Sequence, residues 1–116
     1  MKNKINVLGT EYKIFLNVKT EKEPRLEKAY GFTDFCVKEI VISEDTEKQE
    51  EQSMKNLVEF RNKVIRHEIV HAYLYESGLR ENSERQYAWA DNEEMVDWFA
   101  IQGPKIFKTY KELGVL

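Results

Sequence analysis

Apolar residues recur at a regular interval near the N-terminus of the chain. Every second residue from Tyr12 to Val18 is apolar, after a short strand-like run at 5–8 and the pair Gly9-Thr10. A period of two residues places alternate side chains on one face of a strand, and a glycine between two such runs favours a tight turn. The pattern therefore predicts a β-hairpin with one apolar face.

A further strand is predicted before the helical part of the chain. Pro24 suits the first turn of a short helix that ends near Gly31. The segment Gly-Phe-Thr-Asp at 31–34 is typical of a turn, and the run from Phe35 to Ser43 is rich in valine and isoleucine. We expect this run to form a third strand, at an edge of the sheet where an extended substrate could add as a further strand.

Helical patterns occupy the second half of the chain. No proline or glycine interrupts the helical pattern from Ser53 to Ser77, and Gly78 follows where a left-handed C-cap belongs. A polar connection at 79–87 separates this long helix from the next one.

Two shorter helices are predicted after the connection. The first begins near residues 91–92 and closes at Gly103-Pro104, because a glycine and a proline together usually end a helix. The last helix runs from Pro104 to Leu113, and Gly114 ends it.

Strands before helices are typical of the α+β class. We predict a small N-terminal antiparallel β-sheet of about three strands, packed on the long helix and followed by the two shorter ones. Trp89, Trp98 and Phe99 are expected in the core, pressing the second helix against the long one. The chain has 116 residues, 41% hydrophobic and 34% charged, which fits one globular domain spanning 1–116.

Charge and cysteine content narrow the classes of function. The net charge is -3 and the lysines and arginines are scattered among acids, so no nucleic-acid partner is predicted. The chain has no apolar signal core and no run of membrane-spanning length, so we expect a cytoplasmic protein without a membrane partner. Its single cysteine, Cys36, falls within the third predicted strand and excludes an internal disulfide and a multi-cysteine zinc site.

The chain has two histidines, and they stand four residues apart in His67-Glu68-Ile69-Val70-His71. Residues four apart on an α-helix lie one above the other, so both imidazoles can bind one ion. Glu68 projects beside them, where it can take a proton from a water bound to that ion. The pattern predicts a zinc-binding helix.

The same three side chains fall on the apolar stripe of the long helix, which also carries Leu57, Val64, Ile65 and Ala72. Burying them without partners would cost several kcal/mol, whereas a bound cation satisfies them. The alternative is that the two histidines are hydrogen-bonded in or beside the core without a metal.

A catalytic zinc needs a third protein ligand and an open position for water. Glu93, on the next helix, is the preferred candidate. Asp97 lies one turn later on the same helix face and can accept a hydrogen bond from the outer nitrogen of a ligand histidine. Glu94 and Cys36 are rival ligands, and both glutamates can alternatively be acids that favour the start of a helix.

The two motifs together resemble a known family. His67-Glu68-Ile69-Val70-His71, followed by Asn92-Glu93-Glu94-Met95-Val96-Asp97, is similar to the HExxH and NExxxD pattern of gluzincin metallopeptidases such as thermolysin. The short chain looks still more like the compact phage and mobile-element metallopeptidases related to ImmA.

The resemblance implies a minimal zincin fold and a zinc-dependent metalloendopeptidase with an intracellular protein as its substrate, such as a phage or mobile-element regulator. It assigns zinc binding to His67, His71 and Glu93. It makes Glu68 the general base and Asp97 the residue that orients a ligand histidine.

The residue that stabilises the transition state is not assigned by this resemblance. Larger gluzincins use a downstream histidine to stabilise the transition state, and this chain has none. Tyr75 and Tyr87 are candidates for that role, although a tyrosine more often serves packing. The alternative function is a metal-bearing, non-catalytic or latent module that binds a partner. The oligomeric state is not predicted.

Overall fold

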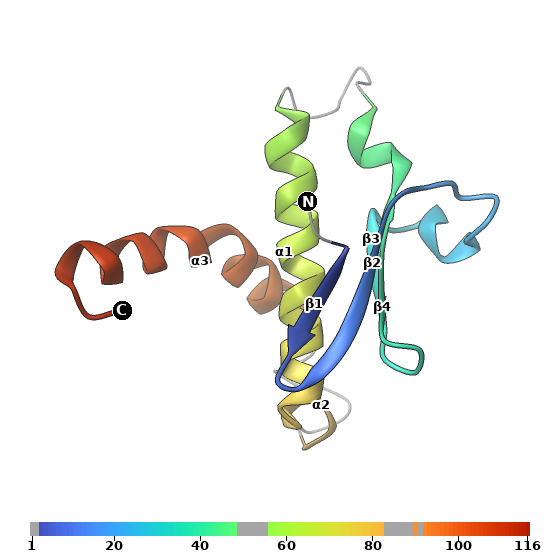
Figure 1. The fold of residues 1–116 in the computed structure, drawn as a ribbon. Helices are drawn as coiled ribbons and strands as arrows, with labels where there is room; N and C mark the ends of the chain where they lie inside the picture. The colour runs from blue at the N-terminus through green and yellow to red at the C-terminus, as the bar shows by residue number, and fades with distance from the viewer. Residues whose placement is uncertain (1–2, 49–55, 83–89, 91) are drawn as a thin grey trace.

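The computed structural model describes residues 3–48, 56–82, 90 and 92–116. It is an α+β structure, in which a four-stranded sheet lies beside one long helix and a second long helix leaves the body at its side (Figure 1). The strands are β1 (Lys4–Val7), β2 (Thr10–Val18), β3 (Gly31–Asp34) and β4 (Glu39–Ser43). The helices are α1 (Leu57–Glu76), the single turn α2 (Leu79–Asn82) and α3 (Glu93–Leu113), and the short 3₁₀ helices are η1 (Pro24–Glu27) and η2 (Glu44–Glu47).

The sheet confirms the N-terminal hairpin and corrects the rest of the strand prediction. Its order is β1-β2-β4-β3, so the described residues form four strands where about three were predicted. The outer pairs are antiparallel, but β2 and β4 run parallel, so the prediction of a purely antiparallel sheet was wrong. A pairing between distant segments leaves no trace in local periodicity, which is why the sequence pattern missed it.

The predicted turn at 31–34 is strand β3, and the true turn lies at residues 35–38. Oδ1 of Asp34 accepts hydrogen bonds from the backbone N–H groups of Cys36 (2.9 Å) and Val37 (3.2 Å), which bends the chain after β3. Cys36 is therefore an exposed turn residue and not a strand residue as predicted. The turn was not predicted because its residues, which include Phe35 and Val37, are typical of a strand.

Gly31 belongs to a close contact between β3 and α1. A Cβ atom at Gly31 would lie 3.1 Å from the carbonyl oxygen of Val41 and 3.2 Å from Cγ1 of Val64 on α1. The glycine thus lets the edge strand approach the helix. Two residues later, Thr33 lies on the same face of the strand and hydrogen-bonds α1 through Glu68.

The core lies between α1 and the sheet (Figure 1). The apolar stripe predicted on the long helix is confirmed for Val64, Ile65 and Ala72, which are buried, whereas Leu57 is only partly buried. Their partners on the sheet are the buried residues Val7, Tyr12, Ile14, Ile40 and Ile42.

The limits of α1 follow from its caps. The Asn56 side chain accepts a hydrogen bond from the backbone N–H of Glu59 at the first turn, as an N-cap residue does. Gly78, with φ of +85°, follows the helix, as predicted for a left-handed C-cap. Positions 53–55 of the predicted helix lie outside the described residues.

Helix α3 continues through the predicted break. It is one helix from Glu93 to Leu113, with Pro104 inside it, and Gly114 ends it with φ of +73°. The prediction of two separate helices was therefore wrong. The second half of α3 extends away from the sheet (Figure 1).

The aromatic residues of α3 are not core residues. Trp98 is 51% exposed and Phe99 46% exposed, whereas Val96 and Ala100 are fully buried in the helix interface. The core prediction for Trp98 and Phe99 was wrong because small side chains, and not aromatic ones, make this contact. Trp89 lies outside the described residues.

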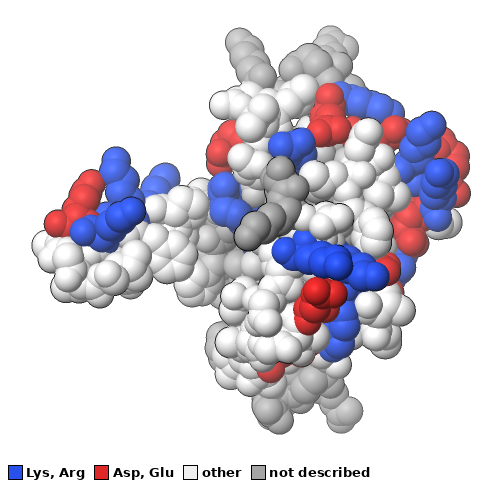
Figure 2. Space-filling view, in the orientation of Figure 1, with Lys and Arg blue, Asp and Glu red and all other residues white. Residues whose placement is uncertain are grey.

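The surface carries both signs of charge. On the face shown in Figure 2, lysines and arginines lie among aspartates and glutamates over the body of the molecule. None of the helices within the described ranges is both long and apolar enough to cross a membrane.

Glu76, the last residue of α1, ties the helix to the sheet. Its Oε2 accepts hydrogen bonds from the Tyr12 hydroxyl (2.8 Å) and from Nζ of Lys38 (2.9 Å). The Lys38 ammonium holds the pKa of Glu76 below its usual range, with a smaller contribution from Tyr12. Burial, followed by the bond to Glu76, raises the pKa of the Tyr12 hydroxyl.

We predict that Gly31→Ala destabilises the protein by ~1–3 kcal/mol, because a methyl group would press on the backbone of β4 and on Val64. The free energy of unfolding in urea measures the effect. Glu11→Ala, at an exposed position of β2, is the control and should change the stability little. A Gly31→Ala protein as stable as the wild type would contradict the close contact.

We also predict that Glu76 contributes to acid sensitivity. A carboxyl with a lowered folded pKa stabilises the protein above its unfolded pKa of ~4.3, and that stability is lost as the pH falls through the folded pKa. The stability difference between wild type and Glu76→Gln should therefore shrink from pH 6 to pH 3 in urea titrations. Glu11→Gln, at an exposed position of β2, is the control, and a difference independent of pH would refute the prediction.

Candidate metal centre

The second half of α1 carries both histidines on one side. The ring centroids of His67 and His71 lie 4.9 Å apart, as expected for residues one turn apart. His71 is buried and His67 half-buried, so both rings are held by their surroundings. The predicted pairing of the two imidazoles is therefore present in the fold.

Glu93, the first residue of α3, reaches both imidazoles. Its Oε2 lies 2.9 Å from Nε2 of His67, and its Oε1 lies 3.0 Å from Nε2 of His71. The three possible ligand atoms lie within 4.8 Å of one another. Two imidazole nitrogens and a carboxylate oxygen are a donor set that fits a tetrahedral zinc with one open position.

Asp97 lies behind His67. Its Oδ1 is 3.3 Å from Nδ1 of His67, the nitrogen that faces away from Glu93, and 3.9 Å from Nζ of Lys63. A carboxylate at the outer nitrogen fixes the orientation of a ligand imidazole. Glu94 is exposed and does not belong to the group of possible ligands found among the described residues.

Glu68 is buried beside His67, His71 and Glu93 but is not one of the three possible ligands. Its Oε1 accepts a 2.9 Å hydrogen bond from the Thr33 hydroxyl, which also lies 3.0 Å from the carbonyl oxygen of Glu68. Burial raises the pKa of the Glu68 carboxyl above its usual range, and the charge of Glu93 acts in the same direction. The Thr33 hydrogen bond and His67 oppose this rise. A fixed carboxyl with a raised pKa is suited to accept and return a proton.

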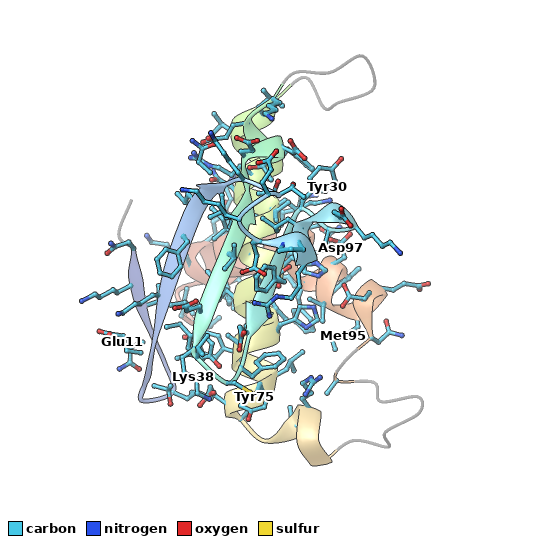
Figure 3. All side chains as sticks on the ribbon, turned by 90° about the vertical axis from the view of Figure 1, so that its right-hand side faces the viewer. Glu11, Tyr30, Lys38, Tyr75, Met95 and Asp97 are labelled. Carbon is cyan, nitrogen blue, oxygen red and sulfur yellow. The ribbon has the colours of Figure 1, made fainter. Side chains whose placement is uncertain are left out.

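A cleft of about 540 Å³ opens in front of these side chains. Tyr30, Phe32, Phe35 and Phe60 give it aromatic walls, and Tyr30 and Phe60 contact each other edge to face with centroids 4.9 Å apart. Lys63 adds a positive charge to the wall. In Figure 3, Tyr30 and Asp97 lie in the same region of the molecule, above Lys38 and Tyr75.

The sheet edge beside the cleft is β3. The backbone N–H of Ser43 donates to the carbonyl oxygen of Tyr30 (2.8 Å), so Tyr30 opposes Ser43 in a hydrogen-bonded pair. Because antiparallel pairs alternate, the backbone groups of Gly31 and Thr33 point away from β4, toward the free edge. The prediction that the strand within Phe35 to Ser43 lies at the edge of the sheet was therefore wrong. This strand, β4, lies between β2 and β3, and β3 is the edge strand.

Tyr75 has a packing role in this structure. Its ring stacks on Phe35, with centroids 4.5 Å apart, and Nζ of Lys38 lies 4.7 Å from its centre. Tyr75 is not among the residues that line the cleft. Tyr87 lies outside the described residues.

Sequence reasoning missed Thr33 and Lys63. Thr33 was hidden in the segment predicted as a turn, and its partner Glu68 is 35 residues away. Lys63 precedes His67 by one helical turn and therefore lies on the same face of α1. That spacing is a local signal from which Lys63 was predictable.

No protein-family model, curated protein or solved structure matches this chain.

Proposed function

We propose that this protein is a zinc-dependent metallopeptidase of the gluzincin type, with a minimal zincin fold and an intracellular protein, such as a phage or mobile-element regulator, as its substrate. The observation that carries the proposal is the convergence of His67, His71 and Glu93 within 4.8 Å. The buried Glu68, which is not part of that group, gives the site a general base beside the proposed metal.

His67 and His71, through Nε2, and Glu93, through its carboxylate, would hold the ion. When bound, zinc polarises the substrate carbonyl and lowers the pKa of water toward ~7. Glu68 takes the proton of the attacking water and gives it to the leaving amine. Thr33 holds the Glu68 carboxyl in place, and Asp97 fixes the His67 ring through Nδ1.

The cleft supports a peptide as the substrate. The outward backbone groups of Gly31 and Thr33 can pair with an extended segment, as in strand addition. The aromatic walls formed by Tyr30, Phe32 and Phe60 favour apolar side chains in that segment.

The alternative is a metal-bearing, non-catalytic or latent module that binds a partner. Exposed apolar side chains on the protruding half of α3 favour it, since Phe107 is 58% exposed and Leu113 73% exposed. Glu68 favours the enzyme, because a structural metal site has no need of a buried carboxylate that is not a ligand.

For Glu68→Gln, we predict unchanged zinc binding and a loss of peptide hydrolysis by several orders of magnitude, because the proton acceptor is removed. Mass spectrometry of a peptide library incubated with each protein measures cleavage. Glu94→Gln, at an exposed position of α3, is the control and should cleave normally. An unchanged rate for Glu68→Gln would sink the catalytic assignment.

For metal binding, we predict one zinc ion per chain in the wild type and much less in Glu93→Ala. Asp97→Asn should lower zinc affinity by ~10–100-fold, because the support of His67 is weakened. Competition with a chelator measures the affinities, with Glu94→Ala as the control. Equal zinc content in Glu93→Ala and the wild type would rule out the three-ligand site.

A further inference from the structure

Pro104 leaves a backbone carbonyl of α3 without its usual partner. In an α-helix, the N–H of residue i+4 donates to the carbonyl of residue i, but proline has no N–H. The carbonyl that loses its donor is that of Ala100, a fully buried residue. A buried acceptor without a partner is costly, so another donor must replace the missing one.

The replacement donor comes from α1. Nε of Arg66 donates a hydrogen bond to the carbonyl oxygen of Ala100. The arginine side chain is partly buried at the contact between the two helices. The proline in α3 and the arginine in α1 therefore form a matched pair, although they are far apart in the sequence.

This hydrogen bond lies next to the candidate metal centre. Arg66 directly precedes His67 on α1, and Ala100 follows Asp97 by less than one turn of α3. Glu93 is 69% exposed and Asp97 41% exposed, so neither carboxylate is held in place by its own packing. Their positions depend on how α3 is held against α1.

The buried apolar contact of α3 is made by small side chains. Val96 and Ala100 are fully buried, and the burial of apolar groups is favourable but not directional. A hydrogen bond from a charged guanidinium is directional and fixes one register. Arg66 supplies this bond within the interface.

We propose that Arg66 is a positioning residue of the metal centre. By bonding the Ala100 carbonyl that Pro104 leaves without a donor, it sets the register of α3 on α1 at which Glu93 reaches both histidines. The inference rests on the proposed function, because it concerns the same metal site.

The ion pair of Arg66 with Glu59 provides a matched control. Nη2 of Arg66 lies 2.9 Å from Oε1 of Glu59, whose side chain is 58% exposed. An exposed ion pair contributes little to the stability of the fold. Glu59→Gln therefore removes this pair and leaves the Nε bond to Ala100 intact.

The test is a double-mutant cycle on Arg66→Met and Pro104→Ala, read out as Co²⁺ and Zn²⁺ affinity. Arg66→Met alone should weaken binding by about tenfold, because a buried carbonyl loses a charged donor. Pro104→Ala restores an N–H at position 104 that can donate to the Ala100 carbonyl. In that background, Arg66→Met should weaken binding by less than about threefold. Glu59→Gln should bind the metal like the wild type.

Amide hydrogen exchange at residues 96–101 gives a second readout without metal. Exchange should be faster in Arg66→Met and return toward the wild-type rate in the double variant. If wild-type protein binds the metal and Arg66→Met binds it equally well, the positioning role is refuted while the metal site stands. An equal loss in both backgrounds would also refute it.

If the wild type binds neither ion, the proposed metal site fails. The hydrogen-exchange rates still test whether Arg66 holds α3 against α1. Equal rates in the wild type and in Arg66→Met would show that it does not.

Discussion

The close contact between β3 and α1 determines the geometry of this molecule. Gly31 lets the edge strand approach Val64, and the period of the strand then brings Thr33 to Glu68. The same contact places the outward backbone groups of β3 beside the histidines. The absence of a side chain at position 31 therefore affects both the proposed general base, Glu68, and the wall of the cleft. A larger residue at position 31 would move the strand, and the hydrogen bond to Glu68 would move with it.

Two carboxyl groups on α1 show how far their surroundings decide their chemistry. Glu68 is buried with one hydroxyl donor, and burial raises its pKa. Glu76, eight residues later, bonds an ammonium and a hydroxyl, and its pKa is lowered. The first suits proton transfer, while the second keeps its charge and holds the helix end to the sheet.

The local parts of the site were predictable from the sequence. His67 and His71 are one turn apart on an uninterrupted helix, and Glu93 and Asp97 have the same spacing on the next one, so each pair follows from helical geometry. The segment at 31–38 shows the limit of such patterns. Strand β3 has the composition of a turn, and the turn that follows it is stabilised by the side chain of Asp34.

Long-range partners could not be predicted from local patterns. Pro104 is tolerated inside α3 because its missing donor is replaced from α1, 34 residues before Ala100. The parallel pairing of β2 with β4 likewise depends on segments that are distant in the sequence. The core prediction for Trp98 and Phe99 followed the usual rule for aromatic residues, but both side chains are exposed. The small residues Val96 and Ala100 are buried in their place.

The division of the three candidate ligands between two helices has a thermodynamic consequence. A cation held by His67, His71 and Glu93 would join α1 to α3 as a cross-link. Its binding free energy would then count toward the folding of the chain, because the unfolded chain does not bring these groups together. The occupancy of such a site and the stability of the α1–α3 interface would rise and fall together.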